Sequence, residues 1–259
     1  MFDQAFIVDG ITRWTDLGIK FPKKLATAIE TFDAIRCAEP GHRPVFDLAG
    51  VTPANAEAKI RSYAEQLVPT LGLVSRVGAV DLSALDVAKQ DAVNAAARDV
   101  LVKAAEAVPG VIEQVTPEFD RAASEFTEAV SGLPDDLSDA AIVQAGPAVL
   151  GEYQRAAQAQ TVIGGFDHWI ASLRSLPGLG VGQVDPVTRV LRPVSVSQLS
   201  HLDNAQTKRY GQLNPLYVVA VREGVEFALN TPQEAAQIRA GIEARGRAHA
   251  EREHRRAIA

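Results

Sequence analysis

The sequence predicts a mainly α-helical protein: an elongated antiparallel helical bundle, followed by a linker and a small α/β C-terminal unit with one β-hairpin. Long alanine-rich stretches place apolar residues three and four positions apart, as amphipathic helices require. Short Pro- and Gly-containing turns separate these stretches, which favours antiparallel neighbours. A β-rich pattern occurs only near the C-terminus. With 259 residues, 47% of them hydrophobic, the chain can bury a core in one large domain or two smaller ones.

Residues 1–50 are expected to form an irregular and partly helical segment. The stretch KKLATAIETFDAIRC has helical spacing through Leu25, Ala28, Ile29, Phe32 and Ile35. The flanking stretches have no clear period, and whether they pack on this chain or on another one stays open. The N-terminus carries acidic rather than basic residues, so we expect no signal peptide and a cytoplasmic or virion location. No apolar run approaches the roughly 20 residues that a membrane span needs.

Residues 51–176 are predicted to form the helical bundle. We expect Pro109-Gly110 to end one helix and Pro147 to kink or break another, because proline lacks the backbone N–H that a helix interior uses. The expected helices run from residue 52 to about 68, from 84 to 108, from 117 to about 130, and from about 138 to 176.

Thr-Pro pairs begin at Thr52, Thr116 and Thr231, and each is a typical helix start. The threonine hydroxyl can accept a first-turn N–H, and proline at the first helical position loses no hydrogen bond. Glu234 adds a capping box to the third start. Ser83, with Asp86 three residues later, is predicted to begin a fourth helix.

Residues 177–193 contain three prolines and three glycines and are interpreted as a linker or extended arm. Residues 194–259 are expected to form a small helix–hairpin–helix unit. A short helix occupies 194–210, and LYVVAVREGVEFALN predicts a β-hairpin around Glu223-Gly224. Because a lone hairpin is marginal in water, it must lie on these helices or pair with another chain.

The stretch HAEREHRR, at 249–256, looks at first like a zinc site, but its spacing argues against one. A zincin helix places two histidines four residues apart, whereas His249 and His254 are five apart and diverge by roughly 140°. Glu39 and His42 repeat a Glu-x-x-His spacing, but Pro and Gly between them prevent a helix. We therefore predict a solvated helix end and no metal ligand. The single cysteine, Cys37, excludes an internal disulfide and is expected to be a buried thiol.

Other catalytic templates also fail, so we assign no catalytic residue, no cofactor and no small-molecule substrate. GLGVGQ at 178–183 lacks the Lys-Ser/Thr ending of a phosphate loop, and no G-x-S-x-G elbow occurs. An enzyme with a site scattered in the sequence remains an alternative. Its candidate residues would be His42, His168 and His201, together with acidic groups.

Charge divides the chain. Residues 54–176 carry 9 basic and 17 acidic side chains, whereas residues 177–259 carry 11 basic and 8 acidic ones. The acidic bundle repels phosphate backbones, and glutamates interrupt the C-terminal arginines, so a protein partner or self-association is favoured over nucleic acid. We expect the last helix to dock on an acidic partner, which can be the bundle of a neighbouring subunit. The candidate interaction surface is Arg247, Arg252, Arg255, Arg256, Tyr217, Val219 and Val221.

In composition and layout the chain resembles minor structural proteins of tailed phages of high-GC actinobacteria. Its helices are rich in alanine, and arginine outnumbers lysine 19 to 7. The resemblance rests on no diagnostic motif, and it implies a head- or connector-associated virion component without enzymatic activity. A secreted helical substrate of an actinobacterial export system is an alternative. Against it, neither Trp14 nor Trp169 is followed by the Trp-x-Gly glycine.

Overall fold

The computed structural model describes residues 4–39, 44–73, 82–180 and 185–258, and it confirms a mainly helical protein. The chain divides into two compact units. Unit 1 comprises Met1–Asp9 and Pro22–Lys103, and unit 2 comprises Gly10–Phe21 and Ala104–Ala259. Helix α1 (Gln4–Thr12) and helix α4 (Ala84–Ser131) each contribute to both units.

Unit 1 contains α2 (Lys23–Cys37), α3 (Ala56–Leu67) and the first part of α4. The predicted helix over KKLATAIETFDAIRC is confirmed, and Leu25, Ala28, Ile29 and Phe32 are its buried residues. A short 3₁₀ turn (Val68–Thr70) follows α3, and β1 (Gly72–Leu73) pairs antiparallel with β2 (Leu82–Ser83). The lone Cys37 is exposed, so the expectation of a buried thiol is wrong.

The two predicted helix starts of unit 1 have different outcomes. At the start of α4, the Asp86 N–H donates to Ser83 Oγ at 3.1 Å, and the Ser83 N–H donates back to Asp86 at 3.0 Å. These reciprocal bonds form the expected cap. The start after Thr52 is wrong, because α3 begins at Ala56. The Thr52 N–H instead donates to the Asn55 side chain at 2.7 Å.

Helix α4 runs unbroken for 48 residues, so the expected stop at Pro109-Gly110 and the new start at Thr116 are both wrong. The Thr116 hydroxyl donates to the Ile112 carbonyl within the helix instead of capping a new one. Both Pro109 and Pro117 are exposed, whereas an apolar stripe on the opposite side continues past them into the core. Burial of this stripe outweighs the lost backbone hydrogen bonds. Its members are Val108, Val111, Val115, Phe119 and Phe126.

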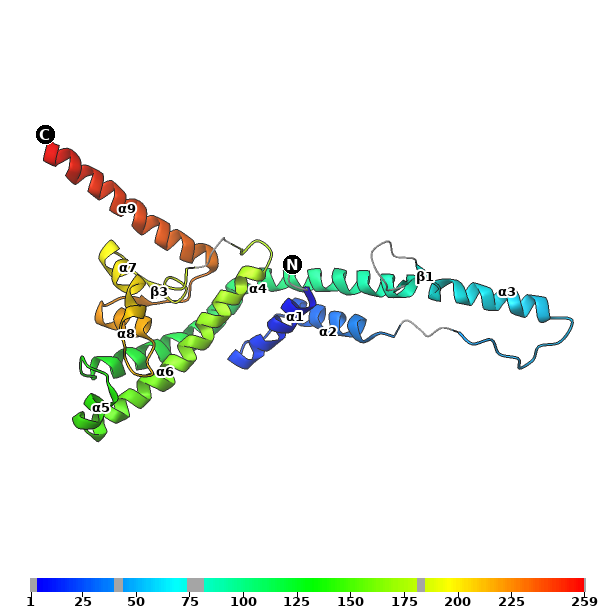
Figure 1. Ribbon diagram of the computed structural model, residues 1–259, viewed down its shortest axis with the longest axis horizontal. Helices are drawn as coiled ribbons and strands as arrows, with labels where there is room; N and C mark the ends of the chain where they lie inside the picture. The colour runs from blue at the N-terminus through cyan, green and yellow to red at the C-terminus, as the bar shows by residue number, and fades with distance from the viewer. Residues whose placement is uncertain (1–3, 40–43, 74–81, 181–184, 259) are drawn as a thin grey trace. The chain divides into compact units, whose positions relative to one another are not determined.

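In unit 2, α4 and α6 (Pro147–Ser172) pack antiparallel, as the bundle prediction requires (Figure 1). Phe119 and Phe166 meet edge to face at their contact, with ring centroids 5.9 Å apart. In the sequence, α5 (Asp139–Ala145) lies between α4 and α6, and the helix break predicted at Pro147 is confirmed. Gly146 ends α5 with φ +94°, and Pro147 begins α6 at its first position. A 3₁₀ turn (Arg13–Leu17) places Trp14 against Trp169 at 5.8 Å.

The segment expected to be a linker is built into unit 2 from residue 185 onward. Val187, Thr188, Val190 and Leu191 are buried, and β3 (Leu191–Arg192) pairs antiparallel with β4 (Glu226–Phe227). The described residues from 104 to 258 belong to unit 2. The remaining elements are a 3₁₀ turn at Leu173–Ser175, α7 (Val196–Asp203), a 3₁₀ turn at Ala205–Thr207, α8 (Pro215–Arg222) and α9 (Pro232–Ile258).

The predicted hairpin is wrong in its first half, where the chain forms α8. Asn214 caps this helix, its side chain accepting the Leu216 N–H at 3.0 Å, and Pro215 occupies the first position. Residues 216–220 are all buried, so tertiary packing overrides the β-propensity of the valines. Only the second half is extended, and it pairs with β3 instead of with residues 216–221. The predicted Thr231–Glu234 capping box of α9 is confirmed by bonds of 2.8 and 3.2 Å.

Candidate functional site

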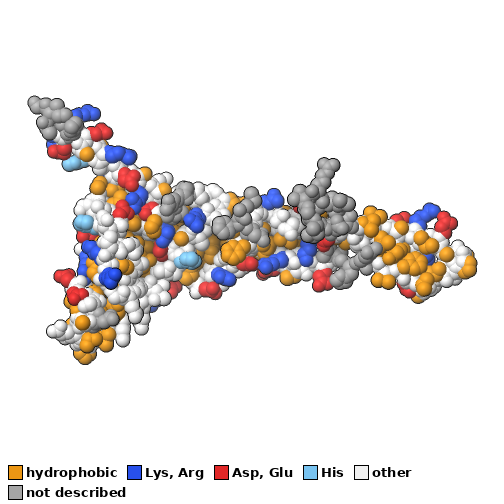
Figure 2. All heavy atoms as spheres, viewed as in Figure 1, with side chains coloured by type: hydrophobic (Ala, Val, Ile, Leu, Met, Phe, Trp, Pro, Cys, Tyr) orange, Lys and Arg blue, Asp and Glu red, His pale blue; other side chains and the backbone are white. Residues whose placement is uncertain are grey.

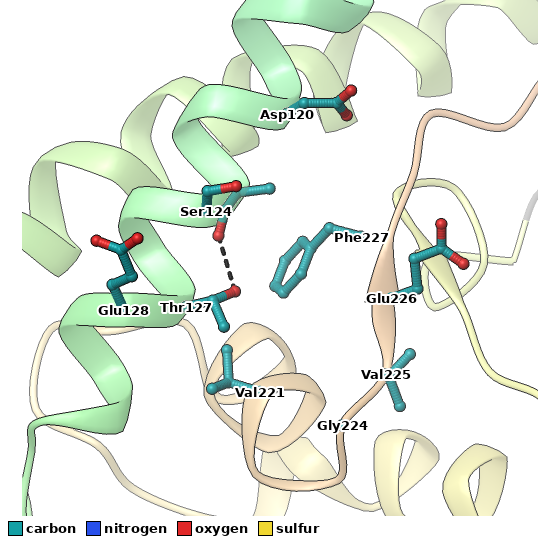
Figure 3. Close-up of a pocket in the computed structure, with 10 residues that line it drawn as sticks. Asp120, Ser124, Thr127, Glu128, Val221, Gly224, Val225, Glu226 and Phe227 are labelled. Carbon is teal, nitrogen blue, oxygen red and sulfur yellow. Dashed lines mark hydrogen bonds between the residues drawn. The ribbon is translucent and has the colours of Figure 1, made fainter.

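A groove in unit 2 lies between α4 and the turn that leads from α8 into β4 (Figure 3). We call it the α4 groove. Its volume is about 610 Å³, large enough for several side chains of a partner. The lining residues are Asp120, Ala123, Ser124, Thr127 and Glu128 on α4, and Val221, Gly224, Val225, Glu226 and Phe227 opposite them.

The floor of the α4 groove is apolar. In Figure 3 the Phe227 ring lies between the strand that carries it and α4. Phe227 also packs edge to face on Phe126 and on Tyr217, with both centroid distances 6.0 Å. Such aromatic clusters fix ring orientation and add to the free energy of burial.

Carboxylates surround this floor. Asp120 and Glu128 stand on the α4 side and Glu226 on the opposite side (Figure 3). A second hollow shares Asp120, Glu226 and Phe227 with the first and continues toward the start of α9. The continuation adds Glu113, Glu234 and a single guanidinium, Arg192. The combined surface thus carries a strong excess of negative charge and would attract a cationic partner.

The C-terminal part of α9 has the opposite character. Gly246 is half-buried, and a Cβ there would lie 2.8 Å from a Val196 methyl. Beyond it, the described side chains of residues 247–256, which we call the arm, are all exposed. Four of them are arginines. Arg256 pairs with Glu253 at 3.2 Å, whereas Arg247 and Arg255 make no ion pair with any residue whose side chain is described.

A third surface lies in unit 1, on α3. None of the helix's residues is buried, although its apolar positions share one side. Ile60 is 59% exposed, and the following Val68 and Leu71 are 63% and 50% exposed. We call these three residues the α3 face. Figure 2 shows hydrophobic side chains gathered over this part of unit 1. Tyr63 is held nearby by an edge-to-face contact with Phe46 at 5.2 Å.

The predicted interaction residues have separate places in the structure. Arg247, Arg252, Arg255 and Arg256 are exposed on the arm, as a docking surface requires. Tyr217 and Val219 are only 2% and 1% exposed, so assigning them to an interaction surface is corrected: they are core residues of α8. Val221 is half-buried and lines the α4 groove.

Sequence reasoning missed Asp120, Glu128, Glu226 and Phe227. The eight-residue spacing of Asp120 and Glu128 on α4 is visible in the sequence. The opposite side of the groove comes from a segment about 100 residues later in the chain, so the sequence alone did not indicate the groove.

The histidines are dispersed. His249 is exposed, His201 pairs with Glu223 at 2.9 Å, and His168 is exposed on α6. His42 and the His254 side chain lie outside the described residues. Among the residues that the structure describes, no group of three His, Cys, Asp or Glu side chains is placed to hold a metal ion. Likewise, no described helix is long and apolar enough to span a membrane.

No known family model, curated protein or solved structure matches this chain.

Proposed function

We propose that this chain is a structural or assembly protein that associates with itself or with a protein partner. The observation that supports this function best is the α3 face. An amphipathic helix normally buries its apolar side, yet α3 leaves Ile60 more than half exposed and buries none of its residues. Exposed apolar side chains gathered in one region are typical of protein interaction sites.

The energetics favour a partner on this face. Burying a Val, Leu or Ile side chain stabilises by about 1.5–3 kcal/mol, so three such residues can supply much of an interface core. The flanking positions Lys59, Arg61 and Glu65 are charged and exposed, as in the polar rim that surrounds many interfaces. An interface built this way would leave unit 1's own buried residues unchanged.

Light scattering and sedimentation over a wide concentration range test this proposal. We expect wild-type protein to form complexes larger than one chain, alone or with a co-purified partner. The double variant Ile60→Asp/Leu71→Asp should weaken that association, because it places charges on the α3 face, and should leave the melting temperature nearly unchanged. Ser62→Asp is the matched control, since Ser62 lies on the opposite side of α3.

The outcomes separate clearly. Association that weakens in the double variant but persists in the control supports the proposal. A wild-type chain that stays monomeric to high concentration and purifies without a partner contradicts it. A large loss of stability in the double variant would show that the α3 face is part of the chain's own core.

We further propose that the assembly is a phage virion, in which the chain is a head- or connector-associated component. Support comes from the resemblance in composition and layout to minor structural proteins of actinobacterial phages. Mass spectrometry of purified particles tests this finer proposal. We expect the chain at a fixed ratio to the main shell protein, and its absence from washed particles would contradict a virion location.

A further inference from the structure

We propose that the arm of one copy docks in the α4 groove of a second copy. This inference deepens the proposed assembly function and rests on it, because it names the partner and the contact. It begins from two surfaces of unit 2 that carry opposite charge. The groove is lined by carboxylates over an apolar floor, and the arm is a fully exposed, arginine-rich helix.

The charges match in spacing as well as in sign. Asp120 and Glu128 are eight residues apart on α4, so they are separated by about 12 Å along the helix and by about 80° around it. Arg247 and Arg255 on the arm are also eight residues apart, with the same rise along the helix axis. When the two helices lie along each other, the long arginine side chains can each reach one carboxylate, although facing right-handed helices turn the two pairs to opposite sides. Across the groove, Glu226 supplies a third acceptor for Arg252.

The apolar parts also fit. The arm carries Ala248 and Ala250 between its arginines, and such small side chains allow a helix to approach a groove closely. Arginine stems cover apolar surface while their guanidinium groups reach the rim, so they can lie over Val221 and Val225. A guanidinium above the Phe227 ring would gain a cation–π contact.

The arm cannot occupy the groove of its own chain. Thr231 and Glu234, at the beginning of α9, line the far end of the groove's continuation. The helix is continuous from Pro232 to Ile258, so Arg247 lies about 20 Å further along its axis than Glu234. Returning to the groove would require breaking the helix. A second copy meets no such constraint.

This contact has a consequence for symmetry. The arm and the groove are different surfaces, so the contact closes as a two-fold dimer only if each copy places its arm in the groove of the other. Without that exchange, the head-to-tail contact produces closed rings or open filaments. Assemblies held by the arm should therefore contain at least two copies. They should also dissociate as salt is raised, because their rim contacts are ionic.

Three charge variants of the full chain test the inference. The groove variant is Asp120→Lys/Glu128→Lys, the arm variant is Arg247→Glu/Arg255→Glu, and the swapped variant combines all four changes. Each substituted side chain is exposed, so folding should be unaffected. We expect the groove variant and the arm variant each to associate at least about tenfold more weakly than wild type. In each variant, like charges face each other across the contact and repel. The swapped variant should regain assembly.

Mixing gives a sharper readout. The groove variant keeps an intact arm and the arm variant keeps an intact groove, so together they can form one contact that cannot propagate. In the Ile60→Asp/Leu71→Asp background, which removes association through the α3 face, we expect an equimolar mixture to give a one-to-one pair by sedimentation and nothing larger. Glu118→Lys/Glu125→Lys is the matched control. It makes the same charge change at exposed positions of α4 that do not line the groove, and it should assemble as wild type does.

Failure of the swapped variant to assemble better than either double variant overturns the inference, as does a control variant that is equally impaired. If wild type assembles and the groove and arm variants do so equally well, the groove and the arm serve other partners. The inference then fails while the proposed assembly function stands, since the α3 face variants test that function independently.

Discussion

Arg189 and Asp167 form a bidentate ion pair that ties the segment before β3 to α6. Arg189 Nε donates to Asp167 Oδ1 at 2.5 Å, and Nη2 donates to Oδ2 at 2.9 Å. Both side chains are only 18% exposed. The pair lies within the packed unit 2, beside the buried Tyr217 of α8. A stretch that reads in sequence as a flexible linker is thus held by a largely desolvated charge pair.

Removing one partner of this pair should destabilise the protein strongly. Arg189→Met keeps the aliphatic volume but leaves the Asp167 carboxylate without its guanidinium, so we expect a loss of about 2–3 kcal/mol in the free energy of unfolding. Urea unfolding followed by circular dichroism measures it. The double replacement Arg189→Met/Asp167→Leu should recover most of the loss. Arg61→Met, which breaks the exposed Arg61–Glu57 pair, should change stability by less than about 0.5 kcal/mol.

Tyr217 should make the protein sensitive to alkali. Burial, and then the neighbouring Asp167 carboxylate, raise the pKa of its hydroxyl well above the ordinary value of 10. The native state therefore keeps the proton that the unfolded chain loses, and stability falls as the pH rises above 10. Tyr217→Phe removes this hydroxyl, so the variant should unfold with a weaker pH dependence above 10.

An absorbance titration provides the check on Tyr217. The chain has four tyrosines. In the native protein, one of these phenols should ionise at a much higher pH than an ordinary tyrosine. This ionisation step should be missing from Tyr217→Phe. A late phase that survives the substitution would assign the raised pKa to a different tyrosine and contradict the prediction.

Gly211 should not tolerate a side chain. Its φ is +62°, in the left-handed region, and a Cβ would clash with the Tyr153 hydroxyl and lie 3.2 Å from the Leu137 carbonyl oxygen. That hydroxyl accepts the neighbouring Gln212 N–H at 2.6 Å. We expect Gly211→Ala to lower the free energy of unfolding by about 2 kcal/mol or more. Gly110→Ala, which meets nothing within 4 Å inside α4, should instead stabilise by about 0.5–1 kcal/mol.

Replacing Pro117 should stabilise the protein. It lies exposed in the interior of α4, where its ring removes a backbone hydrogen bond. Pro117→Ala restores the donor, and we expect a net stabilisation of about 1 kcal/mol after the added freedom of the unfolded chain is subtracted. Differential scanning calorimetry measures the shift. Pro147→Ala is the control, because a first-position proline blocks no helical bond, and it should give no gain.

The sequence correctly predicted the features that depend on interactions between neighbouring residues. The Ser83–Asp86 and Thr231–Glu234 caps, the buried face of α2, the break at Pro147 and the exposed arginines of the arm all follow from neighbouring residues. Each depends on bonds within one turn or on the period of a single helix, which the sequence states directly. The same applies to the opposite charges that support the arm-to-groove inference.

Where local sequence signals conflict with the burial of apolar side chains, only the tertiary structure decided which secondary structure forms. Residues 216–220 have β-propensity but form part of helix α8, because packing around Tyr217 buries all five of them. Pro109 and Pro117 read as helix ends, yet α4 passes both, since its valines and phenylalanines continue into the core on the other side. The α4 groove was also decided by tertiary structure. Asp120 and Phe227 line the same groove because the fold brings together segments that are distant in sequence.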